Sequence, residues 1–81
     1  MTLKAMIIAY VLIIAKSGTE KSVVSELKNY KEIVDAEILY GEYDILAKIK
    51  VKEIADLNEF LLSKVRRVDG VEKTSTLISA A

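Results

Sequence analysis

Two short segments hold the polar side chains that fold requirements explain least: YGEYD, from Tyr40 to Asp44, and TST, from Thr74 to Thr76. Asp44 directly follows Tyr43, and a phenol beside a carboxylate is in principle an acid and base pair. Neighbouring residues on a strand point to opposite faces, so these two groups cannot act on one substrate. We therefore predict no catalytic role for this pair.

The rest of the chain offers little to an enzyme. It has no His and no Cys, so it lacks a neutral-pH proton shuttle, a thiolate nucleophile and the usual ligands of zinc. It has no Walker-type or dinucleotide-binding glycine-rich motif, and its carboxylates are scattered rather than spaced for a metal. We predict a protein that is not an enzyme and that uses no cofactor.

The composition describes a small domain without a net electrostatic field. The 81 residues include 12 basic and 12 acidic side chains, 52% hydrophobic residues and no Pro. Zero net charge disfavours direct binding to nucleic acid or to an anionic membrane. We expect one cytoplasmic domain over residues 1–81. A core of this size is marginally stable, and subunit association is the remaining way to stabilise it without disulfides or metals.

Hydrophobic periodicity and turn residues divide the chain into strands and helices. The run from Met6 to Ala15 is apolar at alternate positions on both sides, which is typical of a central strand covered on both faces. Ser17, Gly18 and Thr19 then break the run and are expected to cap a helix. The expected elements are a strand at 6–15, a helix at about 19–29, a hairpin at 34–51, a helix at about 53–65 and a strand at 71–78.

The hairpin is the segment around which the other elements are arranged. Gly41 at the first turn position suits a two-residue type II′ connection between two strands. With Tyr40 facing Tyr43, the register places Asp35 across from Lys48. Opposite charges at facing positions stabilise an antiparallel pair, so this register is favoured.

The order βαββαβ with right-handed crossovers predicts an α+β ferredoxin-like sandwich. Its antiparallel sheet has strand order 4-1-3-2 and both helices on one face. In the last strand we expect Thr74 and Thr76 on one face and Val71, Ser75 and Leu77 on the other. Because two helices cover only one face, the second apolar face of the first strand requires another subunit. We predict a dimeric α/β barrel formed by sheet-to-sheet packing.

The chain resembles the effector-sensing domain of the Lrp/AsnC family of transcriptional regulators, often called the RAM domain. The matching features are the Gly-x-Tyr-Asp turn at Gly41, Tyr43 and Asp44, the strand ILAKIKV, the helix IADLNEFL and the ending GVEKTSTLI. The match runs from about Ala9 to Ser79. Family regulators carry a helix-turn-helix DNA-binding domain before the first strand, where this chain has only a few residues, so we expect a stand-alone form.

The resemblance implies a regulatory module that binds a small effector, usually an amino acid, between dimers. It also implies dimers assembled into rings such as octamers or decamers, and co-assembly with full-length Lrp/AsnC regulators. The site residues carried over by position are Gly41, Glu42, Tyr43 and Asp44 at the turn and Thr74 and Thr76 on the last strand. An α-amino acid needs an acceptor for its ammonium and donors for its carboxylate, and these groups with the turn amides offer both.

Asp44 is the member of this set that the fold explains least. Its expected cross-strand neighbour is Leu39, and Leu46 follows it on the same face, so no local residue partners the carboxylate.

An RNA-recognition domain shares the element order but needs stacking aromatics on its central strands, which ILAKIKV lacks. One alternative function stays open, a small dimeric α/β-barrel enzyme of the monooxygenase or degradation type. It requires a roomy polar pocket between sheet and helices.

Overall fold

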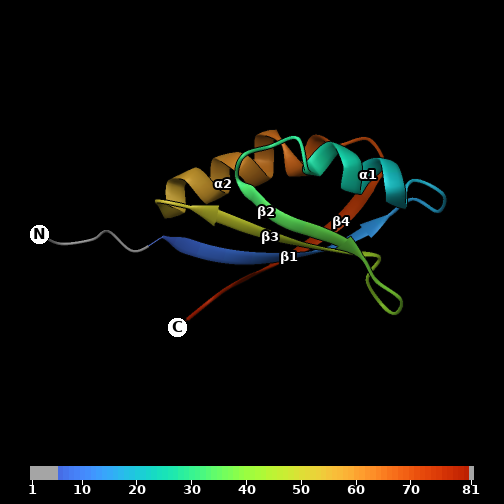
Figure 1. Cartoon of the computed structure of the whole chain (residues 1–81), viewed down its shortest axis with the longest axis horizontal. Coiled ribbons are helices and arrows are strands. Elements are labelled where there is room, and N and C mark those ends of the chain that lie inside the picture. The colour runs from blue at the N-terminus through green and yellow to red at the C-terminus, as the bar shows by residue number, and fades with distance from the viewer. Residues whose placement is uncertain (1–5, 81) are drawn as a thin grey trace, which may run out of the picture.

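The computed structural model describes residues 6–80, and residues 1–5 and 81 of the predicted single domain lie outside this range. The elements follow the predicted order, with a short 3₁₀ helix added before the last strand (Figure 1). Their bounds are β1 Ile7–Ala15, α1 Glu20–Leu27, β2 Ile33–Ile38, β3 Ile45–Val51, α2 Ile54–Ser63, η1 Val65–Arg67 and β4 Val71–Ile78. No helix within residues 6–80 is long and apolar enough to cross a membrane.

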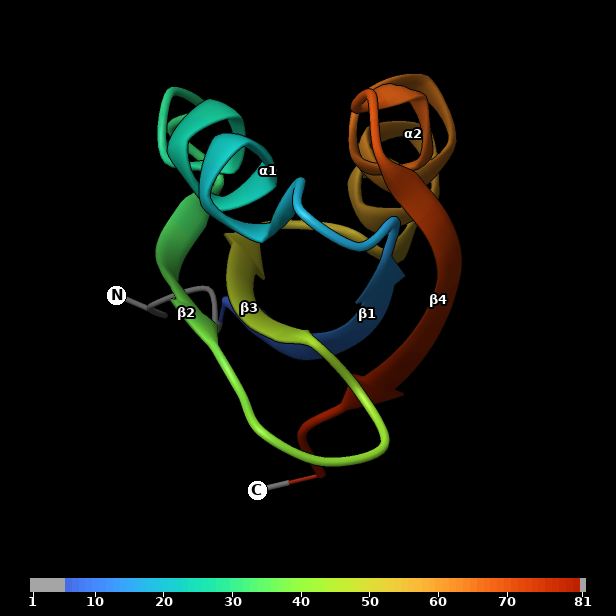
Figure 2. The same cartoon turned by 90° about the vertical axis from the view of Figure 1, so that its right-hand side faces the viewer.

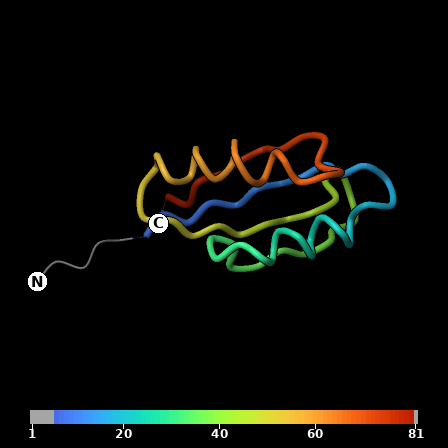
Figure 3. Tube along the Cα trace, turned by 90° about the horizontal axis from the view of Figure 1, so that it is seen from above, coloured from blue at the N-terminus to red at the C-terminus, as the bar shows by residue number. Residues whose placement is uncertain are grey.

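The four strands form one antiparallel sheet in the order β2-β3-β1-β4, which confirms the predicted order. Asp35 pairs with Lys48, as the charge pattern predicted. Both helices lie on one face of the sheet and the other face is open (Figure 2). Seen from above, α1 lies toward the β2 edge and α2 toward the β4 edge (Figure 3).

The core lies between the sheet and the two helices. Alternate residues of the central strands face it, and Val11, Ile13 and Ile49 are 0% exposed. These strands are rich in β-branched residues, which fit a pleated and closely packed surface. Burying each such side chain contributes about 1.5–3 kcal/mol. The helices and the 3₁₀ helix contribute Val23, Leu27, Leu57, Phe60 and Val65 to the same core.

The open face carries the other alternate residues of the sheet. In β1 these are Ile8, Tyr10, Leu12 and Ile14, and all four remain partly exposed. Lys48 lies across from Tyr10 on β3, with its Nζ 5.9 Å from the centre of the ring. A single subunit therefore leaves a central apolar strip of its sheet uncovered, as the two-sided pattern of β1 predicted.

Thr19 is the N-cap residue of α1, which confirms the predicted position, but its side chain does not cap the helix. Thr19 Oγ1 donates to the Lys16 carbonyl at 2.6 Å, and no side chain makes a hydrogen bond that caps the start of α1. The Thr19 amide bonds the same carbonyl at 3.0 Å. The hydroxyl is therefore engaged within the turn after β1 and not by the free amides of the helix.

A β-bulge changes the predicted faces of β4. Ile14 pairs with Lys73 but Ala15 pairs with Val71, so the register shifts between these two positions of β1. The extra residue on β4 turns Val71 toward the helix side, where it packs against the core. The predicted placement of Val71 on the face of Ser75 is therefore wrong.

Candidate functional site

The connection between β2 and β3, residues 39–44, contains the predicted site residues of the turn. Strand pairing ends at Ile38 and Ile45, so Tyr40 and Tyr43 do not close the predicted two-residue turn. The connection is a wider loop that extends past the sheet on its open side (Figures 1 and 2). The predicted register of the hairpin holds, whereas the predicted turn type is wrong.

Two features describe the shape of this loop. The Leu39 N–H donates to the Asp44 carbonyl at 2.8 Å, which joins the two ends of the loop. Gly41 has a φ of 136°, a conformation that residues with a Cβ rarely adopt. Tyr40 is fully exposed at 105% of its reference area. The loop thus presents an aromatic ring and a glycine backbone to whatever approaches it.

Asp44 has partners that the sequence did not indicate. Its Oδ2 accepts a hydrogen bond of 2.8 Å from the Ala15 N–H, at the end of β1. Its own N–H donates to the Ile13 carbonyl at 2.9 Å. The expectation that the carboxylate lacks a partner is therefore wrong. Asp44 thus bonds to β1 on one side and, through the Leu39 N–H, to the end of β2 on the other.

A groove of about 470 Å³ lies beside this loop and the first turn of α1. We name it the loop groove. Of the predicted site residues, Gly41 and Asp44 line it, whereas Glu42, Tyr43 and the two threonines do not. Its lining residues are Glu20, Lys21, Ile38, Leu39, Tyr40, Gly41 and Asp44. The α1 residues could have been found from topology, because α1 follows the end of β1 and β1 neighbours β3.

Thr74 and Thr76 are separated from the loop groove within one subunit. They pair with Ile13 and Val11 of β1, so they lie on the helix side of β4. The strand β1 lies between β4 and β3, which separates Thr74 from Ile45 by about 9.5 Å, or two strand spacings. A single chain therefore does not bring the predicted threonines and Asp44 into one pocket.

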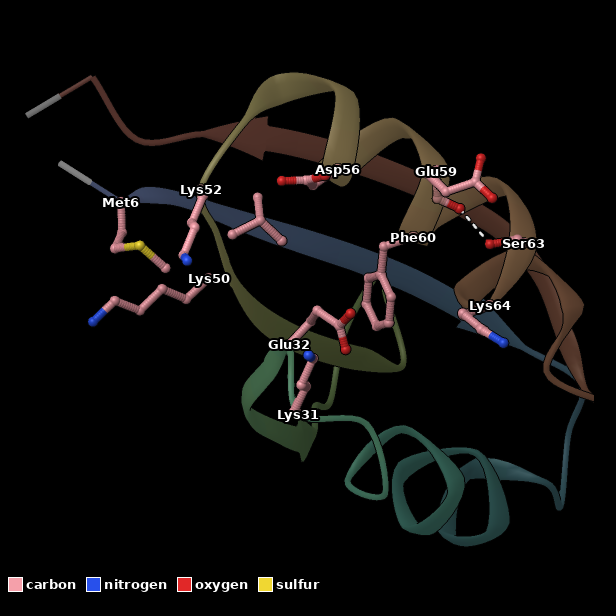
Figure 4. Close-up of a pocket in the computed structure, with 11 residues that line it drawn as sticks. Met6, Lys31, Glu32, Lys50, Lys52, Asp56, Glu59, Phe60, Ser63 and Lys64 are labelled. Carbon is pink, nitrogen blue, oxygen red and sulfur yellow. Dashed lines mark hydrogen bonds between the residues drawn. The ribbon is translucent and has the colours of Figure 1, made fainter. Parts of the chain in front are cut away.

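A larger hollow of about 700 Å³ lies beside α2, at the other end of the sheet. We name it the α2 hollow. The Phe60 ring stands near its centre (Figure 4), packed edge-on against Tyr30 with the ring centres 5.6 Å apart. Charged side chains of both signs surround it: Lys31, Glu32, Lys50, Lys52, Asp56, Glu59 and Lys64. No sequence pattern predicted this hollow, and its mixed charge favours neither an anion nor a cation.

The middle of β3 is closely packed on the side that faces the helices. Ile45, Ala47 and Ile49, the positions of β3 that face the helices, are 0% exposed. At these positions apolar side chains fill the space between the sheet and the helices, where the alternative enzyme would need a polar pocket. Within residues 6–80, no group of three or more acidic side chains is placed to hold a metal ion.

Comparisons with known proteins agree with this geometry. The chain matches the family model of the Lrp/AsnC ligand binding domain over residues 8–80. The HTH-type transcriptional regulator FL11 of Pyrococcus furiosus is 42% identical over 72 residues, covering 89% of this chain and 47% of that protein. The regulatory protein AsnC of Haemophilus influenzae is 34% identical over 71 residues, covering 86% of this chain and 47% of that protein. The chain spans about half the length of the curated relatives it matches.

Solved structures show the same fold. The hypothetical protein PHS023 from Pyrococcus horikoshii superimposes with a TM-score of 0.88 at 31% identity, covering 93% of this chain and 90% of that one. The family model extends over nearly the whole chain and over both edges of the sheet. The chain belongs to the Lrp/AsnC ligand-binding domain family.

Proposed function

We propose that the chain is a regulatory module that binds an amino acid in the loop groove and acts through the assembly of its subunits. The observation that carries this proposal is the loop groove itself, found in a domain whose family is described as ligand-binding. The curated relatives are transcriptional regulators, and this supports a regulatory rather than a catalytic role.

The groove offers the chemistry that an α-amino acid requires. The carboxylates of Asp44 and Glu20 are acceptors for the ammonium, and the Lys21 amine is a donor for the carboxylate. Ile38 and Leu39 supply apolar contact for a side chain. A volume of about 470 Å³ is within the range of small-molecule sites.

The groove is open in one subunit, so we propose that a second subunit completes the site. Thr74 and Thr76 would then reach the effector from another chain, because β1 separates them from Asp44 in their own chain. This arrangement is consistent with the resemblance, in which the effector lies between dimers. In this arrangement, binding of the effector and assembly of the subunits are thermodynamically linked, so each favours the other.

We further propose that the open face of the sheet forms the dimer. Its central strip of Leu12, Ile14 and their neighbours is apolar and uncovered, and such a strip is stabilised when a second sheet packs against it. In this proposal the dimers assemble into rings such as octamers or decamers. Full-length regulators of the family would join them through the same surfaces.

A thermal-shift screen with the twenty amino acids tests the effector. A ligand at 100 times its dissociation constant adds about 2.7 kcal/mol to the free energy of unfolding. The screen is read out as a rise in the melting temperature. A shift with no amino acid would contradict the proposed effector and leave only the assembly role.

The location of the site is tested with the amino acid that gives the largest shift. Asp44→Asn should weaken its binding by about 1.5–3 kcal/mol, because a charge-assisted bond to the ammonium is lost. The matched control is Asp56→Asn, the same change at an exposed carboxylate of the α2 hollow. If calorimetry shows that only Asp56→Asn weakens binding, the effector lies in the α2 hollow.

A further inference from the structure

Asp44 connects the β2–β3 loop to the end of the neighbouring strand. Its N–H donates to the Ile13 carbonyl at 2.9 Å, and its Oδ2 accepts from the Ala15 N–H at 2.8 Å. Its carbonyl accepts from the Leu39 N–H at 2.8 Å, at the other end of the loop. The backbone and side chain of Asp44 thus bond to both the other end of the loop and the last residues of β1.

The bond to Ala15 continues the sheet where the backbone pairing stops. The β1–β3 pairing ends at Ile13 and Ile45. The carboxylate of Asp44, the residue before Ile45, accepts a hydrogen bond from the Ala15 amide. Ala15 is also the position at which β1 shifts its register against β4. The Ala15 amide lies on the β3 side of β1, beyond the last β1–β3 pair, so the Asp44 carboxylate supplies an acceptor where the ladder offers none.

The rest of the loop contributes little to its own position. Tyr40 is fully exposed, and a Cβ added at Gly41 would have nothing within 4 Å. Within residues 6–80, the two hydrogen bonds that join this loop to β1 both belong to Asp44. The shape of the loop groove therefore depends on this residue more than on the others that line it.

We propose that Asp44 is a positioning residue that locks the β2–β3 loop onto the end of β1 and so transmits the state of the loop groove to the strand that carries the open face. This inference rests on the proposed function only in taking the loop groove as the effector site. Ile14, which precedes Ala15, lies on the open face. A change in the loop groove would reach that face through the two hydrogen bonds of Asp44 to β1, one from its backbone and one to its side chain.

The Asp44 carboxylate has two roles, a bond to Ala15 and attraction for an ammonium. One oxygen is engaged by Ala15, and the remaining acceptor positions are available to an ammonium. In Asp44→Asn the amide oxygen can accept from Ala15, which leaves an NH₂ donor toward the groove. This variant keeps the bond from Ala15 and loses the attraction for the ammonium, whereas Asp44→Ala loses both and keeps only the backbone bond to the Ile13 carbonyl.

Amide hydrogen exchange, followed by NMR on the full chain without any effector, tests the lock. In Asp44→Ala the exchange rate of the Ala15 amide should rise about 10- to 100-fold, as expected for the loss of a hydrogen bond to a charged group. The amide of Leu39, which bonds the Asp44 carbonyl at the other end of the loop, should exchange faster as well. In Asp44→Asn both amides should stay within about threefold of the wild type.

The matched control is Asp35→Ala. Asp35 Oδ1 accepts a hydrogen bond from the amide of the next residue, Ala36, at 2.9 Å, so this variant loses a similar bond that joins no second strand. It should leave the Ala15 amide and the loop unchanged.

An unchanged exchange rate of Ala15 in Asp44→Ala would overturn the proposal. Faster exchange at Ala15 with a normal loop would overturn it too, because the bond would then be local. Should the alanine variant unfold, Asp44→Asn decides alone, since faster exchange at Ala15 or in the loop would show that the oxygen does not hold them. No effector is present, so the result is independent of whether an amino acid binds.

Discussion

The two faces of the sheet differ in how far one subunit completes them, although both are apolar along β1. On the helix side, Val11 and Ile13 are 0% exposed, and their partners on β3, Ala47 and Ile45, are 0% exposed as well. On the open side, Leu12 and its partner on β3, Leu46, both remain partly exposed, and Lys48 lies across from Tyr10. The stability of one subunit therefore depends mainly on the helix side. The open side is the surface that we propose for the dimer.

The largest effect is expected from a charge on the helix side. Val11→Asp places a carboxylate at a position that is 0% exposed and surrounded by apolar side chains. The cost of several kcal/mol is comparable with the whole stability of a small domain. Circular dichroism should show no cooperative thermal transition. A melt within a few degrees of the wild type would contradict the assignment of Val11 to a core complete within one subunit.

The same charge one residue later should act on assembly instead. Leu12→Asp faces the open side, so we expect a folded monomer in sedimentation velocity at micromolar concentration, where the wild type is expected to be at least a dimer. Leu62→Asp is the matched control, since Leu62 is 57% exposed on α2, on the helix side of the sheet. A stable wild-type monomer, or equal loss of assembly in both variants, would contradict the proposed dimer face.

A smaller effect is expected when Gly70, which lies against the start of α1, is compared with Gly41 in the β2–β3 loop. A Cβ at Gly70 would lie 2.6 Å from Thr19 Oγ1 and 2.8 Å from Thr19 Cβ, whereas a Cβ at Gly41 would meet nothing within 4 Å. Both have a positive φ. Gly70→Ala should lower the free energy of unfolding by about 2–4 kcal/mol and Gly41→Ala by about 1–2 kcal/mol. Urea titration at equal protein concentration measures both, and equal losses would mean that backbone strain alone matters.

The smallest expected effect concerns the contact between Lys48 and Tyr10 on the open face. The Lys48 Nζ lies 5.9 Å from the centre of the ring, so Lys48→Ala should cost about 0.5–1 kcal/mol. Lys50→Ala is the control, an exposed lysine on the same strand that should cost less than about 0.5 kcal/mol. Thermal melts of both variants check the difference. A larger loss for Lys50 would show that the ring contact does not stabilise this face.

The fold could be predicted because its signals are local or periodic. Alternation along β1 and β3 assigns each residue to a face, and the pairing of Asp35 with Lys48 follows from charge and spacing. The bulge at Ala15 and the back-bonded Thr19 were missed, since each depends on how a short turn fits against a second strand or carbonyl.

The candidate site was predictable only in part. The sequence drew attention to Asp44, but its partner Ala15 lies 29 positions earlier and uses a backbone amide, which no residue type reveals. Thr74 and Thr76 lie on a strand, as predicted. Within one subunit they are not beside Asp44, because β1 lies between β4 and β3. Glu20 and Lys21 were missed since a helix start becomes part of a groove only when the strands on either side are in place.

The central position of β1 has a consequence for biosynthesis. Both strands that pair with β1 follow it in the chain, and the second of them ends at Ile78. The strand is nine residues long, IIAYVLIIA, without a charge, and its side that pairs with β4 stays unpaired until Ile78 has been synthesised. Uncharged segments of high β-propensity aggregate when they are exposed, and distant pairing is slow to form. Because aggregation depends on the concentration of incompletely folded chains, the soluble fraction of this chain should fall as its expression level rises.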